Sequence, residues 1–208
     1  MKCIVQVLLL FNLLITSCAE HGEAEKINIA DATKISVTIP DRTVEKSLAN
    51  YDRKTSLWSL NDERYSGYLV SYYEDGTFEE KIGILNGKIQ NQSTKWYPDG
   101  HLKEVTNYHE GKLHGEKKLW STDANHILLR HLNYHEGKAH GEQRQWYPTG
   151  EFYKKLNLQM GREQGIQQAF RKNGELYANY EAKEGRIFGL KKASLCYGLE
   201  DENINYEK

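Results

Sequence analysis

The 208-residue chain has little proline, cysteine or methionine, and it carries almost no net charge. It holds 3 Pro, 3 Cys and 2 Met, and 28 basic side chains stand against 29 acidic ones. A broad nucleic-acid surface needs a clustered excess of Lys and Arg, so this balance argues against a nucleic-acid partner. Cys3 and Cys18 precede the expected domain, so we expect no disulfide framework and interpret Cys196 as a small buried residue.

Common signatures of catalysis and of nucleotide binding are also missing from the sequence. There is no G-x-S-x-G motif, no cysteine in a plausible catalytic triad, no P-loop and no G-x-G-x-x-G. We therefore predict a protein that is not an enzyme and that has no catalytic residue, cofactor or metal.

Hydrophobic residues make up only 38% of the chain, whereas Tyr and Gly are abundant, at 14 and 17. Tyrosine favours strands, and glycine favours tight turns because it accepts positive φ. This combination predicts a β-sheet with many turns and a thin core.

The first residues are typical of an export signal. Lys2 supplies a positive charge, and residues 4–15 are mostly apolar, a run too short to span a bilayer as a helix. The run Ile-Thr-Ser-Cys that ends at Cys18 resembles the lipobox of bacterial lipoproteins, in which the peptide is cut before the cysteine and the cysteine is acylated. The resemblance implies a signal peptide over 1–17 and lipidation of Cys18. The alternative is an ordinary secretory signal that happens to contain Cys18.

The lipobox resemblance also implies a location. A lipid anchor at Cys18 would hold the protein in the bacterial cell envelope. Ala19, which follows the cysteine, resembles the sorting signal for the outer membrane.

The region after the anchor divides by composition. Residues 18–55 are expected to form a tether with N-terminal strand segments, because Ile35, Val37 and Ile39 alternate with polar residues. Another strand is predicted over 56–60. A repeat domain is expected over 56–198, and a polar tail over 199–208.

The main feature of the chain is an internal repeat. Gly-Lys or Gly-Arg pairs recur at spacings of 24, 26, 24 and 24 residues. They begin at Gly87, Gly111, Gly137, Gly161 and Gly185. The 26-residue unit contains a two-residue insertion near the stretch STDANH at 121–126.

Equivalent positions in the units share their chemistry. An aromatic residue stands nine positions into each unit, and an Asp-Gly or Asn-Gly turn follows in most units. The column consists of Tyr72, Trp96, Trp120, Trp146 and Phe170. Apolar residues then return with period two, which indicates strands. We predict an all-β fold, an elongated single-layer stack of antiparallel β-hairpin repeats in which the aromatic column is buried.

The units resemble the bacterial variant of the MORN repeat. The stretches STKWYPDGHLKEVTNYHEGKLHGE and EQRQWYPTGEFYKKLNLQMGRE follow its pattern of paired aromatics, a Gly turn, a further aromatic and G-K-x-x-G. The resemblance covers about residues 57 to 190, with Asn91 in place of one glycine and no Asp-Gly in the turn at 121–126. It implies a MORN-like β-solenoid or meander. The family includes YwqK-like antitoxins, which implies docking to a partner protein.

Histidines cluster in two of the turns. The stretches HEGKLH at 109–114 and HEGKAH at 135–140 come close to the zinc motif H-E-x-x-H, but the second His falls one position late. That motif also needs a helix, which a Gly-Lys turn does not allow. We predict that His114 and His140 occupy equivalent repeat positions and face solvent or a neighbouring hairpin; a metal held by a cross-turn pair such as His109 and His114 is the alternative.

One strand column is mostly charged along the stack. It contains Glu80, Glu104, Arg130, Lys154 and Ala178. Two of its carboxylates about 10 Å apart resemble the pair of an inverting glycosidase. A ladder of ion pairs is the simpler interpretation.

Three tyrosines follow the aromatic column and should point to the opposite face of the sheet. They are Tyr73, Tyr97 and Tyr147. If they are exposed, they form a stacking platform for a partner protein or a glycan; otherwise the sheet or the N-terminal segment covers them. By alternation we expect the fold to tolerate their loss.

We therefore expect a non-catalytic lipoprotein of the cell envelope that acts as a protein-interaction scaffold. The alternative is an envelope glycan-binding protein, or a metal-dependent hydrolase that uses His109, His114, His135 and His140.

Overall fold

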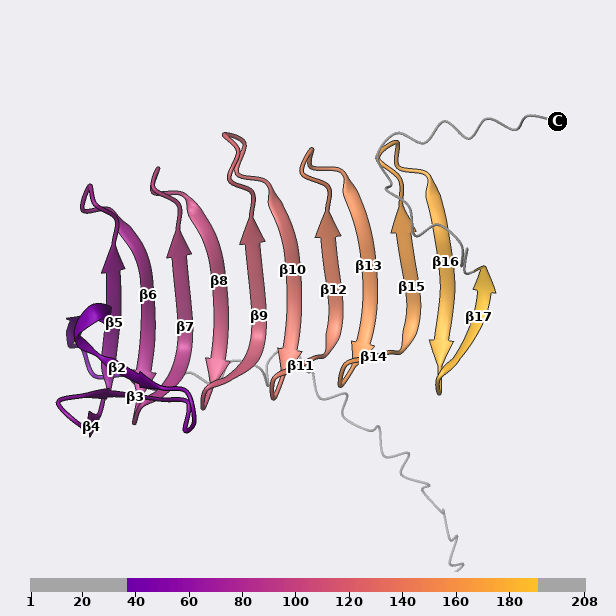
Figure 1. The fold of residues 1–208 in the computed structure, drawn as a ribbon. Helices are drawn as coiled ribbons and strands as arrows, with labels where there is room; N and C mark the ends of the chain where they lie inside the picture. The colour runs from indigo at the N-terminus through magenta and orange to yellow at the C-terminus, as the bar shows by residue number, and fades with distance from the viewer. Residues whose placement is uncertain (1–36, 191–208) are drawn as a thin grey trace, which may run out of the picture.

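The computed structural model describes residues 37–190, and these form a long open sheet (Figure 1). The sheet has 14 strands and does not close into a barrel. Neighbouring strands along the path follow chain order and pair antiparallel, except that β1 pairs with β5 in parallel. The predicted all-β stack of antiparallel hairpins is confirmed.

Five hairpins make up most of the sheet. They are β5 (Gly67–Tyr72) with β6 (Phe78–Leu85), β7 (Lys88–Trp96) with β8 (Leu102–His109), β9 (Lys112–Trp120) with β10 (Leu128–His135), β12 (Gly141–Trp146) with β13 (Phe152–Gln159), and β15 (Gly165–Phe170) with β16 (Leu176–Lys183). The short strands β11 (Lys138–Ala139) and β14 (Arg162–Glu163) precede β12 and β15, and β17 (Arg186–Leu190) ends the path.

A small cap covers the N-terminal end. The strand β1 (Thr43–Glu45) leads through a 3-10 turn, η1 (Lys46–Leu48), into a second sheet. That sheet contains β2 (Asn50–Asp52), β3 (Leu57–Leu60) and β4 (Glu63–Arg64). The strand predicted over 56–60 is therefore confirmed as β3.

The other predicted N-terminal strand does not form within the described residues. The segment 37–40 has no strand pairing. Instead, the side chain of Asn91 donates from Nδ2 to the carbonyl of Val37 at 2.6 Å and accepts from its N–H at 3.3 Å. Ile39 is buried, with 7% exposed. The apolar alternation in the sequence thus corresponds to an irregular segment in which Ile39 is buried and the side chain of Asn91 holds the backbone of Val37.

The apolar core sits where the cap meets the first hairpin. Its buried members are Trp58, Tyr65, Leu69, Ile82 and Ile84. Farther along the sheet, buried side chains are often polar, and two glutamines fill gaps in the backbone ladder. Gln143 accepts from the N–H of Asn133 at 3.1 Å and donates to its carbonyl at 2.9 Å. Gln167 does the same with Asn157, at 3.0 and 2.8 Å.

The turns that follow β6, β8, β10, β13 and β16 lie at the lower edge of the sheet in Figure 1, and we call them the lower turns. They link each unit to the one before. Both central residues have positive φ, for example 48° at Glu110 and 82° at Gly111, which is the two-residue hairpin turn that matches strand twist. The N–H of Gly111 donates to the carbonyl of Ile89 at 2.8 Å, and Gly137 does the same to Leu113 at 2.8 Å.

Asn91 is explained by the backbone. It has φ 59°, and the equivalent residues in later units are glycines with φ between 81° and 98°. Asn is among the few residues with a side chain that tolerate this left-handed conformation. Asn91 departs from the repeat pattern in residue type, but it keeps the left-handed backbone bend that glycine makes at this position in the later units.

Candidate functional site

The aromatic column forms a partly exposed stripe across the sheet. Each member pairs across the hairpin with a returning apolar residue: Tyr72 with Phe78, Trp96 with Leu102, Trp120 with Leu128, Trp146 with Phe152, and Phe170 with Leu176. We call these ten residues the aromatic stripe. The expected full burial is not found, because Tyr72 and Phe78 are each 46% exposed.

Contacts between units pass through the returning residues of the stripe. The ring centroids of Phe78 and Trp96 lie 5.7 Å apart, and those of Phe152 and Phe170 lie 5.4 Å apart. Leu102 and Leu176 are 39% and 43% exposed. The stripe is thus both a packing element and an accessible apolar surface.

The three tyrosines beside the stripe are structural ties. The hydroxyl of Tyr73 donates to the carbonyl of Trp96 at 2.8 Å, that of Tyr97 to Trp120 at 2.9 Å, and that of Tyr147 to Phe170 at 3.0 Å. Burial raises the pKa of Tyr73 and Tyr147. Each hydroxyl is hydrogen-bonded to the next hairpin. In place of the earlier expectation that the fold tolerates loss of these tyrosines, we now expect their loss to lower the free energy of unfolding.

The two glutamates of the charged column form ion pairs, in line with the simpler interpretation. Glu80 pairs with Lys46 and with Lys95, the latter at 3.5 Å. Glu104 pairs with Lys117 at 3.0 Å. Burial alone would raise the pKa of Glu104, but hydrogen bonds from Lys117 and Thr106 hold it below its usual value. The carboxylates of this column are therefore held by cations of neighbouring strands and by the cap.

A histidine row runs along the lower turns, and it comprises His109, His114, His135 and His140. Successive ring centroids lie 5.7, 4.9 and 5.7 Å apart. The His114 residue is 7% exposed, and its Nδ1 lies 3.5 Å from Glu136 of the next turn. Burial lowers the pKa of His114, and the neighbouring His135 adds to this effect. His114 thus faces a neighbouring hairpin, as predicted.

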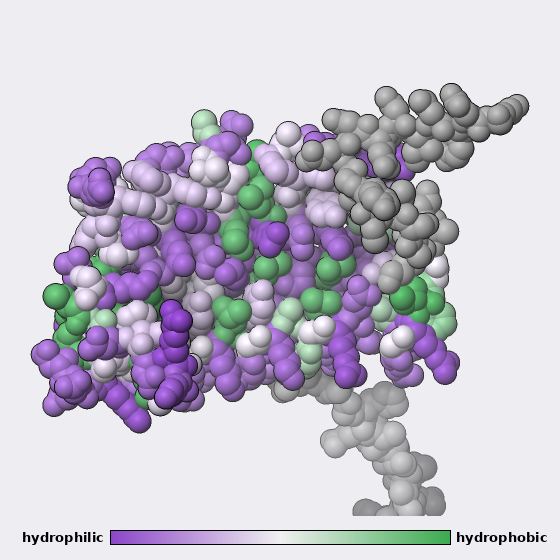
Figure 2. All heavy atoms as spheres, in the orientation of Figure 1, coloured by the Kyte–Doolittle hydropathy of each residue, from purple (hydrophilic) through white to green (hydrophobic). Residues whose placement is uncertain are grey.

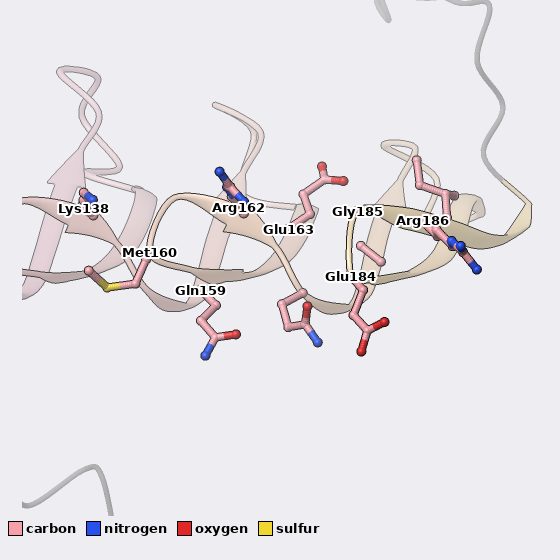
Figure 3. Close-up of a pocket in the computed structure, with 11 residues that line it drawn as sticks. Lys138, Gln159, Met160, Arg162, Glu163, Glu184, Gly185 and Arg186 are labelled. Carbon is pink, nitrogen blue, oxygen red and sulfur yellow. The ribbon is translucent and has the colours of Figure 1, made fainter.

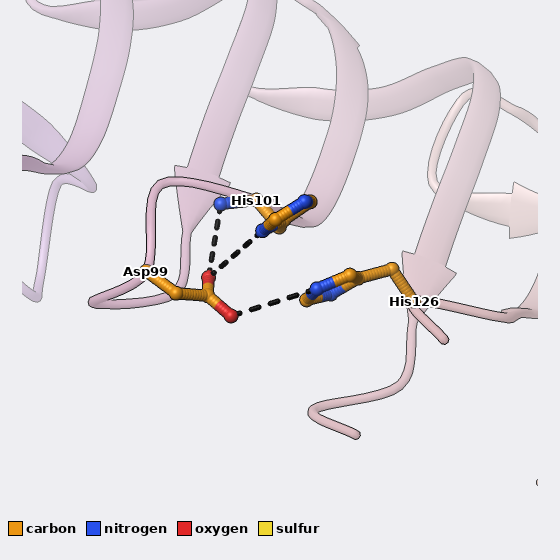
Figure 4. Close-up of side chains that lie close together, drawn as sticks. All are labelled: Asp99, His101 and His126. Atoms are coloured by element: carbon orange, nitrogen blue, oxygen red, sulfur yellow. Dashed lines mark hydrogen bonds and ion pairs between the residues drawn. The ribbon is translucent and has the colours of Figure 1, made fainter. Parts of the chain in front are cut away.

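A different group brings metal-binding atoms together. Among residues 37–190, ligand atoms of three such side chains lie within 4.8 Å of one another only at Asp99, His101 and His126 (Figure 4). This group is not among the sites expected from the sequence. Its signal was present in the insertion, which places His126 in the one turn that departs from the period.

A repeated asparagine was also missed. Asn107, Asn133 and Asn157 donate from Nδ2 to the carbonyls of Glu116, Glu142 and Ile166 in the paired strands. Their identity at one unit position was the available signal. These amides satisfy strand carbonyls next to the glycine bend.

An open hollow lies at the lower turns of the last units (Figure 3). Basic side chains, such as those of Lys138, Arg162 and Arg186, alternate around it with the acidic Glu163 and Glu184. The hydroxyl of Tyr180 donates to Glu163 at 2.9 Å. The mixed charge does not favour a ligand of either sign.

Several predicted features lie outside the described residues. These are the signal peptide at 1–17, the lipidation site Cys18, the buried cysteine Cys196 and the tail at 199–208. Within the described residues, no helix has the length and apolar character needed to cross a membrane.

Comparison with known proteins gives no family for this chain. No protein-family model matches it. No curated protein matches it significantly either.

Proposed function

We propose that this protein is a non-catalytic scaffold that binds a partner protein through its sheet. The observation that carries the proposal is the aromatic stripe, which crosses all five hairpins while leaving Tyr72, Phe78, Leu102 and Leu176 39–46% exposed. Aromatic and apolar anchors held on a rigid surface are typical of protein interfaces. The repeat gives the stripe its length, because every hairpin contributes one pair.

The surface around the stripe supports recognition through mixed contacts. Figure 2 shows one face of the molecule, on which hydrophilic side chains predominate and hydrophobic ones form separate patches. Ion pairs such as Glu116 with Lys118 at 2.8 Å and Glu142 with Lys155 at 3.0 Å lie on strand surfaces. Apolar anchors with a polar surround resemble an interface in which charge sets specificity.

The likeness of the units to the MORN-repeat variant supports the same proposal, since that resemblance implies docking to a protein in the manner of YwqK-like antitoxins. The place of action is proposed to be the bacterial cell envelope, with the chain anchored to the outer membrane. The support is the lipobox-like run that ends at Cys18.

The stripe is tested by comparing captured partners. The full chain with Tyr72→Ser, Phe78→Ser and Leu102→Ser should lose at least ~10-fold of the partner captured from native membranes, because exposed anchors contribute most of the binding energy. The matched control carries Met160→Ser, Ile166→Ser and Ile187→Ser, which are also exposed at 42–46% but lie outside the stripe. Capture is measured by quantitative mass spectrometry, and folding by circular dichroism.

Equal capture by both triple variants would reject the stripe as the interface. The unmodified chain could instead retain a purified envelope glycan that the stripe variant does not retain. That result would identify the partner as a glycan and not a protein.

The anchor is tested by metabolic labelling with a fatty acid. Cys18→Ala should abolish incorporation of the label and release the protein from the membrane fraction, because acyl chains on that cysteine supply the attachment. Cys196→Ala is the control and should incorporate label like the unmodified chain. Labelled Cys18→Ala protein would show that the lipobox assignment is wrong.

A further inference from the structure

Two neighbouring hairpin turns lie at the upper edge of the sheet in Figure 1, and side chains from them come together in Figure 4. Asp99 and His101 belong to the turn between β7 and β8, and His126 belongs to the longer turn between β9 and β10. Figure 4 shows both imidazoles directed at the Asp99 carboxylate. The Nδ1 of His101 lies 3.4 Å from Oδ1, and the Nε2 of His126 lies 3.6 Å from Oδ2.

We propose that Asp99, His101 and His126 form a binding site for a divalent transition cation of the zinc class. Ligand atoms about 2.0–2.2 Å from a tetrahedral zinc lie roughly 3.3–3.6 Å from one another. The two N–O separations, one to each oxygen of the carboxylate, fall in this range, and they are longer than ordinary charge-assisted hydrogen bonds. One ligand atom from each of the three side chains lies within 4.8 Å of the other two, so a modest side-chain movement brings them to the spacing of ligands of one small cation.

The choice of ligands favours zinc over calcium or magnesium. Two imidazoles and one carboxylate are typical of zinc and its transition-metal neighbours, whereas Ca²⁺ and Mg²⁺ prefer oxygen ligands throughout. Three protein ligands leave a fourth position for water or for a donor atom of another molecule.

The carboxylate is fixed before any cation arrives. The backbone N–H of His101 donates to Asp99 Oδ1 at 3.0 Å. This bond orients the carboxylate within its own turn. Because the turn already holds this carboxylate in place, cation binding loses less side-chain conformational entropy, which is a form of preorganisation.

The imidazoles are held less firmly. Their rings stack at 3.5 Å with an interplanar angle of 10°, so one must rotate for both lone pairs to reach a common cation. His101 is the ring with room to do so, since its side chain is 57% exposed and that of His126 only 17%.

The placement of His126 is the second, independent observation. It adopts φ 45°, a conformation that costs energy for a residue with a side chain. Its buried Nδ1 has no hydrogen-bond partner within the described structure. The longer turn is well ordered by Ser121, whose N–H donates to the carbonyl of Ile127 at 2.8 Å and whose hydroxyl accepts from the N–H of Ile127 at 2.9 Å. The insertion therefore delivers a strained, otherwise weakly bonded imidazole to the carboxylate of the preceding hairpin.

A cation bound here would connect the second and third hairpins at their tips. It would bind only the folded stack, so it should raise the melting temperature, and the stabilisation should grow with the logarithm of the free cation concentration once this exceeds the Kd.

The test is a zinc titration of the metal-free full chain against a chromophoric chelator, with Co²⁺ absorption as the second readout. The unmodified chain should bind one equivalent. His126→Asn should weaken binding at least ~10-fold, the effect typical of removing even an outer-shell contact. Asn tolerates positive φ, so this variant should be folded and as stable as the parent without zinc. His101→Gln should weaken binding to a similar extent.

The matched controls are His114→Gln in the histidine row and His131→Gln on the sheet, and both should bind zinc like the unmodified chain. The proposal is overturned if the unmodified chain does not compete with the chelator. It is also overturned if His126→Asn binds normally, or if His114→Gln removes the bound equivalent.

Discussion

Leu69→Ala should lower the free energy of unfolding by about 2–5 kcal/mol, the usual range for emptying a fully buried leucine site. Leu69 is 0% exposed and belongs to the cluster formed by the cap and the first hairpin. Few other side chains in the described sheet are as deeply enclosed. The loss should therefore be a large part of the total stability, which for a domain is roughly 5–15 kcal/mol. Urea denaturation followed by circular dichroism measures the change.

Leu176→Ala is the matched control for this prediction. It removes the same atoms from a leucine that is 43% exposed at the other end of the sheet. Its effect should be less than about 1 kcal/mol, because little apolar area is removed from contact. Losses of equal size for the two variants would show that the stability is not concentrated at the cap.

Tyr97→Ala should lower the free energy of unfolding by about 2–4 kcal/mol, since a partly buried ring and its hydrogen bond are both lost. Its hydroxyl donates to Trp120 at 2.9 Å, so the damage falls between the second and third hairpins. The backbone N–H at position 97, which donates to the carbonyl of His101 at 2.8 Å, is kept in the variant, so the turn that carries Asp99 should retain its shape.

Tyr97→Phe separates the hydroxyl from the ring. It should cost about 0.5–1.5 kcal/mol, the typical net value of one hydrogen bond. Melting curves that coincide for the unmodified chain, Tyr97→Phe and Tyr97→Ala would mean that the tyrosine ties add nothing, and the stacking platform would again be the better explanation of these residues.

The hairpin architecture was predictable because it depends on local, repeated signals. Glycine at fixed positions sets the turns, and alternation sets the faces of each strand. The same reasoning did not reach the hydrogen bond of Tyr97, because alternation predicts the side of the sheet and not the acceptor of a hydroxyl. That acceptor is the carbonyl of Trp120, 23 residues along the chain, and it is reached only once the hairpins are stacked.

The candidate sites were less predictable for the same reason. The histidine row was visible as two similar stretches, although the contact of His114 with His135 depends on the spacing of adjacent units. The group at Asp99 depends on the path of the irregular turn that carries His126, and no repeated signal gives that path. The residue types at one repeat position do not predict how exposed the stripe is. Tyr72 and Trp96 occupy the same unit position, but Tyr72 is exposed whereas Trp96 is partly buried.

The bond that four successive lower-turn glycines make to the preceding unit has a consequence for how such a protein evolves. Gly87 makes it with the carbonyl of Tyr65 at 2.7 Å, next to the cap, and Gly161 repeats it with Ala139 at 2.7 Å. From Gly87 to Gly161, each unit thus offers its successor the same acceptor that it received. Duplication or deletion of a whole 24-residue unit would create no new kind of junction, so the length of the molecule can change in steps of about 10 Å while both ends stay as they are. If a partner spans several hairpins, selection for binding it would set the number of units, so that the length of the sheet matches the length of the partner.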